Sequence, residues 1–166
     1  MKHMSDLKWI FAIGGAASGK SAWAETICVQ AGRRLLYVAT MRAQGQEAAA
    51  RIQKHRTMRA GKGFDTLECP SGLLHLPIEG YYDAVLVEDT GNLAANLLFE
   101  EQRPMERIVR DTMDGLGKLR CHTGLVVVVG NDVFSGSSRL DEPLKDYIRL
   151  LGKLHSEIAE RSDVLV

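Results

Sequence analysis

The chain alternates short, wholly apolar runs with longer segments of helical pattern or helix-forming composition. Runs that are apolar throughout are typical of strands buried on both faces of a sheet. They predict strands over 9–13, 35–39, 84–87 and 125–129, with shorter strands over 64–69 and 164–166. Helices are predicted in the intervals, over 20–31, 46–58, 93–101, 105–119 and from Asp141 onward.

The last predicted helix has the clearest apolar stripe. Asp141 is suited to cap it, and Pro143 is compatible with its first turn. Apolar residues spaced by threes and fours predict the buried face, formed by Leu144, Tyr147, Ile148, Leu151, Leu154 and Ile158.

Strands that alternate with helices indicate βαβ units, and therefore an α/β fold with a mostly parallel sheet flanked by helices. The length of 166 residues suits one domain. We expect a single nucleotide-binding domain over 1–166, in which 1–8 form a flexible N-terminal extension. Ligands bind such sheets beyond the carboxyl ends of the strands, so the informative residues directly follow the predicted strands.

Residues 14–21 follow the first predicted strand and match the phosphate-binding loop G-x-x-x-x-G-K-S. Glycines let the backbone curl around a phosphate, and the helix that follows presents its positive end. We expect Lys20 to contact the β and γ phosphates as a catalytic residue, and the Ser21 hydroxyl to coordinate Mg²⁺. An accidental Lys-Ser in a glycine-rich turn is the alternative, which the flanking strand and helix disfavour. The predicted nucleotide-binding residues of the loop are Gly14, Gly15, Ala16, Ala17, Ser18, Gly19, Lys20 and Ser21.

Two acidic residues, Glu88 and Asp89, follow the predicted strand over 84–87. We interpret Glu88 as a second metal-site residue, because it stands at a strand end of this sheet type. The alternative is that the two acids cap the next helix, a role for which Asp89 is well suited.

A histidine lies among basic residues on the predicted helix over 46–58. Arg51, His55 and Arg59 are spaced by four and share one helical face. A neutral imidazole nitrogen is a nucleophile, and arginines hold the phosphate that it attacks. The alternative is a solvated basic face with an ordinary ion pair between Glu47 and Arg51. The charge pattern alone does not choose between the two.

Composition narrows the class of protein. Lysine plus arginine and aspartate plus glutamate both number 21, whereas proteins that bind nucleic acid usually carry a basic excess. The three cysteines are scattered, which favours reduced thiols in a cytosolic protein. No apolar run approaches the roughly 18 residues of a membrane span. We therefore expect a cytoplasmic protein with no membrane span and no nucleic-acid partner.

Taken together, the motifs resemble the bifunctional adenosylcobinamide kinase/adenosylcobinamide-phosphate guanylyltransferase family of cobalamin biosynthesis. The resemblance covers nearly the whole chain, and the Arg-Ile-Gln-x-His helix is its most specific part. The matching segments are 14–21, 36–40 (Leu-Tyr-Val-Ala-Thr), 50–56 (Ala-Arg-Ile-Gln-Lys-His-Arg), Glu68-Cys69, Glu88, 96–99 (Asn-Leu-Leu-Phe) and 131–133 (Asn-Asp-Val).

The resemblance implies a three-layer P-loop NTPase fold of the RecA-like type and a homotrimer. It implies a two-step enzyme that uses ATP and/or GTP with Mg²⁺ and acts on a corrinoid. A nucleoside triphosphate phosphorylates adenosylcobinamide, and GMP from GTP then passes through His55 to the phosphorylated corrinoid, giving adenosylcobinamide-GDP. The positions that look like the family's nucleotide site are Thr40, Arg56, Arg59, Glu68 and Glu88.

The chain also departs from the family pattern. Ala17 stands where the family usually has arginine, and Asp89 where it usually has cysteine. Residues 134–138 and His155-Ser156 replace the usual Val-Pro and Asn-Gln pairs. Two other hypotheses stay open: a related kinase with a changed substrate, and a nucleotide-dependent binding or regulatory protein. The latter needs no histidine such as His55.

Overall fold

The computed structural model describes residues 9–15, 17–132 and 141–166. Its centre is a six-stranded parallel sheet in the order β3-β2-β4-β5-β1-β6. The strands are β1 (Trp9–Gly14), β2 (Leu35–Ala39), β3 (Phe64–Glu68), β4 (Ala84–Glu88), β5 (Val126–Asn131) and β6 (Val164–Leu165). Strand β5 lies between β1 and β4, so the strand before the phosphate loop and the strand that ends in Glu88 are not neighbours.

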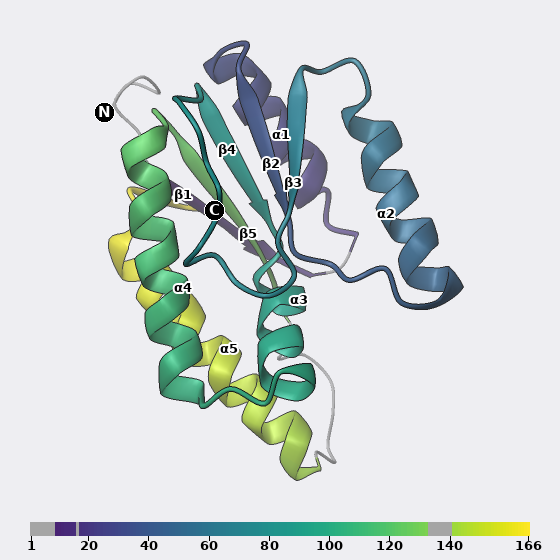
Figure 1. Cartoon of the computed structure of the whole chain (residues 1–166), viewed down its shortest axis with the longest axis vertical. Helices are drawn as coiled ribbons and strands as arrows, with labels where there is room; N and C mark the ends of the chain where they lie inside the picture. Colours follow the sequence, from purple (N-terminus) through teal and green to yellow (C-terminus); the bar gives the residue numbers. More distant parts are fainter. Residues whose placement is uncertain (1–8, 16, 133–140) are drawn as a thin grey trace.

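Helices cover both faces of the sheet, which confirms the predicted layers (Figure 1). One face carries α1 (Lys20–Ala31), and the other carries α3 (Thr90–Ala95), α4 (Met105–Leu119) and α5 (Glu142–Arg161). The remaining long helix, α2 (Gly45–Arg59), stands at the edge of the sheet beside β3 (Figure 1). Each face has its own apolar core, because the strand residues alternate between the two sides.

Two predicted boundaries differ from the structure. The helix expected over 93–101 begins at Thr90, because the Asp89 side chain caps it, and continues from Asn96 to Glu100 as a π-helix. Strand β5 runs on to Asn131, which pairs with Gly14 at the end of β1. The remaining predicted strands and helices agree with the structure to within two residues.

The predicted stripe on α5 is partly wrong. Leu151, Leu154 and Ile158 are buried as expected, but Leu144 is 38% exposed. Leu150 and His155 are buried instead, since the helix packs on the sheet through its later turns. All three cysteines are free thiols, as predicted. Among the described residues, no helix combines the length and apolarity that crossing a membrane requires.

Candidate active site

The phosphate loop joins the end of β1 to the start of α1, as the sequence predicts. Gly19 has φ of 84°, the left-handed region that favours glycine, and Ala17 reaches φ of 58°. The Lys20 ammonium donates a hydrogen bond to the Gly15 carbonyl at 2.8 Å, so it already folds back over the loop. Ala16 lies outside the described residues. The loop therefore presents the backbone and the cation that a triphosphate needs.

Glu88 is the link between the phosphate loop and the rest of the site. The Ser21 hydroxyl donates to Glu88 Oε1 at 2.5 Å, and the Tyr37 hydroxyl donates to Oε2 at 3.2 Å. Glu88 is 7% exposed, and burial raises its pKa, although the hydrogen bond from Ser21 and the nearby His55 act in the opposite direction. A carboxylate and a hydroxyl beside a phosphate loop are the hard oxygen ligands that Mg²⁺ accepts.

Asp89, by contrast, serves the fold of the next helix. Its carboxylate accepts hydrogen bonds from the Asn92 backbone at 2.7 Å and from the Asn92 side chain at 2.9 Å, which makes it the N-cap of α3. The Asn131 side chain also donates to it at 3.2 Å. The two adjacent acids thus divide the roles that the sequence left open: Glu88 faces the phosphate loop, and Asp89 caps a helix.

His55 lies on α2 and faces Glu88. Its Nδ1 atom is 3.6 Å from Glu88 Oε1, and its side chain is 22% exposed. The same Nδ1 is buried and has no hydrogen-bond partner among the described residues. Arg51, on the same helix, is exposed to solvent, and the alternative ion pair with Glu47 does not form between these two described residues. The histidine therefore points inward to the site, whereas Arg51 lies outside the pocket that His55 lines.

The other predicted nucleotide residues are placed in three different ways. Arg56 forms an ion pair with Glu68 at 2.9 Å, and both side chains are more than half exposed. Arg59 is 7% exposed and stacks on the Tyr37 ring, with its guanidinium carbon 3.4 Å from the ring centroid. Arg56, Glu68 and Arg59 line one pocket together with His55 and Glu88.

Thr40 is the predicted residue that lies behind this pocket. It is fully buried, and its hydroxyl donates to the carbonyls of Glu88 at 3.0 Å and Asp89 at 2.8 Å. The Asp89 backbone N–H donates back to the same hydroxyl at 2.8 Å. In this structure Thr40 therefore holds the backbone on which Glu88 is mounted.

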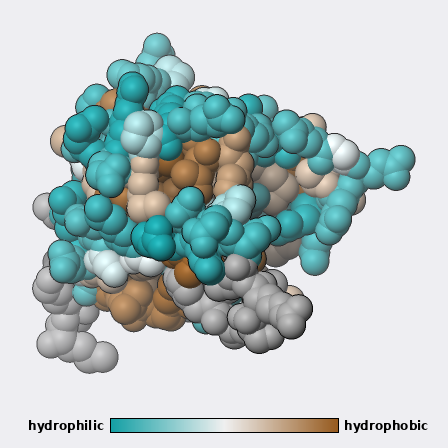
Figure 2. Space-filling model, turned by 90° about the horizontal axis from the view of Figure 1, so that it is seen from below, coloured by the Kyte–Doolittle hydropathy of each residue, from teal (hydrophilic) through white to brown (hydrophobic). Residues whose placement is uncertain are grey.

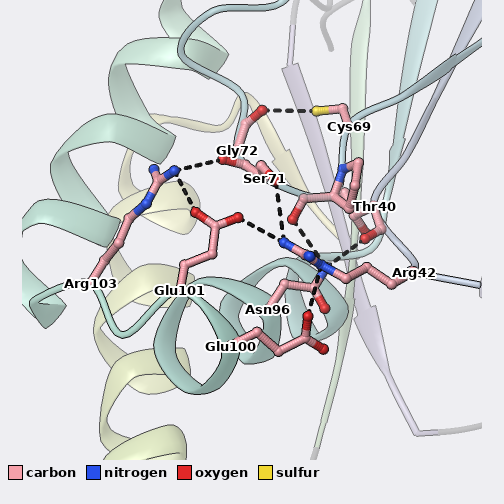
Figure 3. Close-up of polar contacts among 10 residues, drawn as sticks. Thr40, Arg42, Cys69, Ser71, Gly72, Asn96, Glu100, Glu101 and Arg103 are labelled. Carbon is pink, nitrogen blue, oxygen red and sulfur yellow. Dashed lines mark hydrogen bonds and ion pairs between the residues drawn. The ribbon is translucent and has the colours of Figure 1, made fainter. Parts of the chain in front are cut away.

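A polar network that the sequence analysis missed braces the loops beside the pocket (Figure 3). Arg42, just after β2, forms ion pairs with Glu100 at 3.0 Å and with Glu101 at 2.7 Å. Arg103 joins Glu101 to the Ser71 carbonyl. The Asn96 side chain donates to Thr40 O at 2.8 Å and to Pro70 O at 3.1 Å. The network ties the loops after β2 and β3 to the end of the π-helix. The sequence signal available for it was the Asn96 segment.

All of these features lie at the carboxyl edge of the sheet. Figure 2 views the molecule from this side and shows hydrophilic residues around hollows that contain hydrophobic atoms. The pocket beside His55 has this mixed character, because Met41 and Ile52 line it along with the charged residues. Such a pocket suits a ligand with a flat apolar part and an anionic part. Residues 133–140, which hold Val133 and the divergent 134–138 segment, lie outside the described residues.

Three comparisons with known proteins bear on this site. Residues 10–166 match the model of a family described as cobinamide kinase / cobinamide phosphate guanyltransferase. The chain is 32% identical over 154 residues to the bifunctional adenosylcobalamin biosynthesis protein CobP of Pseudomonas aeruginosa, covering 91% of this chain and 87% of that protein. It is 32% identical over 168 residues to the CobU protein of Salmonella typhimurium, covering 93% and 91%.

Among solved structures, the chain resembles the ATPase domain of a helicase with a TM-score of 0.50 and 9% sequence identity. That match covers 98% of this chain and 69% of the other. At this level of identity the likeness concerns the fold, and it agrees with the predicted P-loop NTPase class.

Proposed function

This chain belongs to the cobinamide kinase / cobinamide phosphate guanyltransferase family, and on that premise we propose that it is a two-step transferase of cobalamin biosynthesis with His55 as its covalent nucleophile. In the first step, the hydroxyl oxygen of adenosylcobinamide attacks the γ phosphorus of a nucleoside triphosphate. The bond from that phosphorus to the β–γ bridging oxygen breaks, the nucleoside diphosphate leaves, and the hydroxyl releases its proton.

In the second step, a ring nitrogen of His55 attacks the α phosphorus of GTP. A P–N bond forms, the bond to the α–β bridging oxygen breaks, and pyrophosphate leaves with the electron pair. A phosphate oxygen of adenosylcobinamide phosphate then attacks the same phosphorus, the P–N bond breaks, and adenosylcobinamide-GDP forms. The histidine regains a neutral ring, so no other reactant is consumed.

The observation that carries this proposal is the contact between His55 and Glu88. The imidazole lies 3.6 Å from the carboxylate that also accepts the Ser21 hydroxyl at 2.5 Å. A nucleotide whose phosphates occupy the loop would therefore extend toward the histidine. A proton on Nδ1, facing Glu88, would leave Nε2 as the nucleophilic nitrogen.

Ser21 and Glu88 are the residues that would hold Mg²⁺. The part of the chain that the structure describes contains no group of three or more metal-ligating side chains. Magnesium in phosphoryl-transfer sites usually takes one or two protein oxygens, with nucleotide phosphates and water completing its coordination, and the donors here fit that pattern. The ion would neutralise charge that develops on the phosphates. Lys20 and Arg56 would contact phosphate oxygens from either side.

The test is covalent labelling with GTP that carries the label on its α phosphate. Wild-type protein is expected to form an adduct that is labile in acid and stable in alkali, as a P–N bond requires. His55→Ala should form none, whereas His75→Ala, on a loop outside this pocket, should label like wild type. Equal labelling of His55→Ala and wild type would refute the nucleophile.

Phosphorylation of adenosylcobinamide by the purified protein would exclude a kinase with a changed substrate. Nucleotide binding without turnover or labelling would instead favour a regulatory protein. The family resemblance also implies a homotrimer, which light scattering by the purified protein tests directly.

A further inference from the structure

Tyr37 is a buried tyrosine under the proposed site. It lies in β2, between β3 and β4, and is 4% exposed. It pairs with Leu86 in the neighbouring strand, so Glu88, two residues farther along β4, is its diagonal neighbour on the same face of the sheet. A tyrosine in a buried strand normally contributes only apolar area, but both ends of this side chain have polar partners.

The hydroxyl of Tyr37 holds one half of the site. It donates to Glu88 Oε2 at 3.2 Å while Ser21 donates to Oε1 at 2.5 Å. The two carboxylate oxygens are therefore held by two hydroxyls, one from a strand and one from the helix after the phosphate loop. Burial raises the pKa of Tyr37, and the Glu88 carboxylate raises it further, so the phenol stays protonated and remains a donor.

The ring of Tyr37 holds the other half. The Arg59 guanidinium lies over it at 3.4 Å, and Phe64 packs edge-on at 6.4 Å between ring centroids. The Arg59 Nη1 atom is buried without a hydrogen-bond partner among the described residues, so the stack is a principal contact of this cation.

Arg59 is the last residue of α2, one turn after His55. It is also the buried residue of that helix, whose other side chains are exposed or half-buried. Fixing Arg59 on Tyr37 therefore fixes the height and rotation of the turn that carries His55, because a helix transmits the position of one turn rigidly to the next.

We propose that Tyr37 is a positioning residue with two separable roles: its hydroxyl orients Glu88 in front of Ser21, and its ring anchors Arg59 and thereby the His55 turn of α2. The proposal rests on the proposed function for the roles of Glu88 and His55. It assigns Arg59 to the anchor, in place of a direct contact with nucleotide.

Two variants separate the roles. Tyr37→Phe keeps the ring and removes the hydroxyl, whereas Arg59→Met keeps a long side chain and removes the cation. Tyr81→Phe, at a tyrosine that is 56% exposed, is the matched control. Three quantities are measured: the Mg²⁺ concentration for half-maximal binding of a fluorescent GTP analogue, the rate of labelling from α-labelled GTP, and amide hydrogen exchange of residues 53–59 without nucleotide or metal.

Tyr37→Phe is expected to raise the half-maximal Mg²⁺ concentration about tenfold, the size of one lost hydrogen bond to a charged group, while exchange at 53–59 stays as in wild type. Arg59→Met is expected to leave the Mg²⁺ dependence within about twofold of wild type. Its exchange at 53–59 should be about thirtyfold faster, the equivalent of a desolvated cation–π contact, and its labelling correspondingly slower.

Each contrary result has a distinct meaning. Unchanged Mg²⁺ dependence in Tyr37→Phe overturns the role of the hydroxyl. Slow labelling in Arg59→Met without faster exchange identifies Arg59 as a nucleotide ligand and overturns the anchor. Equal effects of both variants on all three quantities indicate general loss of packing and overturn both roles. If wild type itself does not label at His55, the proposed function fails, but the exchange difference in Arg59→Met still tests the anchor.

Discussion

His155 is expected to make the stability of this fold depend on pH. It lies on α5 with 6% of its surface exposed, its Nε2 atom is 2.8 Å from the Thr90 hydroxyl, and its ring packs edge-on against Phe11 at 5.3 Å between centroids. Burial lowers the pKa of His155 from 6.5 to about 4, although the nearby Asp132 acts in the opposite direction. The folded protein therefore resists protonation at a position where the unfolded chain accepts a proton readily.

The sign of the effect follows from proton linkage. A folded-state pKa below the unfolded value gives stability that is fully present above about pH 6.5 and is lost as the pH falls toward about 4. Since each pKa unit corresponds to about 1.4 kcal/mol, the loss cannot exceed about 3 kcal/mol. About 2 kcal/mol of it falls between pH 7 and pH 4.5, because protonation of the unfolded chain is nearly complete at the lower value.

Urea unfolding followed by circular dichroism measures this loss directly. Wild type and His155→Gln are compared at pH 7, 6, 5 and 4.5; glutamine does not titrate and retains an amide that can bond to the Thr90 hydroxyl. Glu88, whose pKa burial raises, titrates in both proteins and cancels in the difference. Wild type should lose about 2 kcal/mol more than the variant over this range. Parallel losses in the two proteins would show that His155 is not the group responsible.

Two further predictions use pairs of matched residues. A Cβ atom added to Gly115 would lie 2.6 Å from the Leu73 backbone, whereas one added to Gly117 in the same helix has nothing within 4 Å. Gly115→Ala should therefore lower the free energy of unfolding by about 2 kcal/mol, and Gly117→Ala should raise it by up to about 1 kcal/mol; urea unfolding that ranks them in the reverse order would contradict this packing. Lys20→Ala should weaken binding of a nucleoside triphosphate at least about tenfold in calorimetric titration, because one charge-assisted contact to phosphate is lost. Lys153→Ala, exposed on α5, should bind as wild type does, and unchanged affinity in Lys20→Ala would rule out the phosphate loop as the binding site.

Local patterns were sufficient for the elements and for the phosphate loop. The strand runs are apolar throughout, and a parallel sheet with helices on both faces buries such runs completely. Gly19 lies in the left-handed region at the start of α1, as the loop pattern requires. These features depend on neighbours within a few residues along the chain, which is why the sequence predicts them well.

The sequence was less informative where one residue type fits two roles. Glu88 and Asp89 are adjacent acids, and only the end of β4 decides that the first faces Ser21 while the second caps α3. Arg59 was expected on an open basic face with His55, yet it is buried on Tyr37. Tyr37 itself has the pattern of an ordinary core residue, because its partners come from β4 and α2, far away in sequence.

By itself, the sequence determined that this chain forms a parallel α/β sheet with a phosphate loop after its first strand, because apolar period and glycine placement act over short distances. Tertiary structure decided the strand order β3-β2-β4-β5-β1-β6, since any of these apolar runs could occupy several places in a buried sheet. That order places the ends of β2 and β4 side by side and brings α2 to the edge beside them. Ser21, Tyr37 and His55 meet at Glu88 for this reason alone: the hydrogen bonds from Ser21 and Tyr37 to Glu88 span 67 and 51 positions of the chain, and no local pattern extends that far.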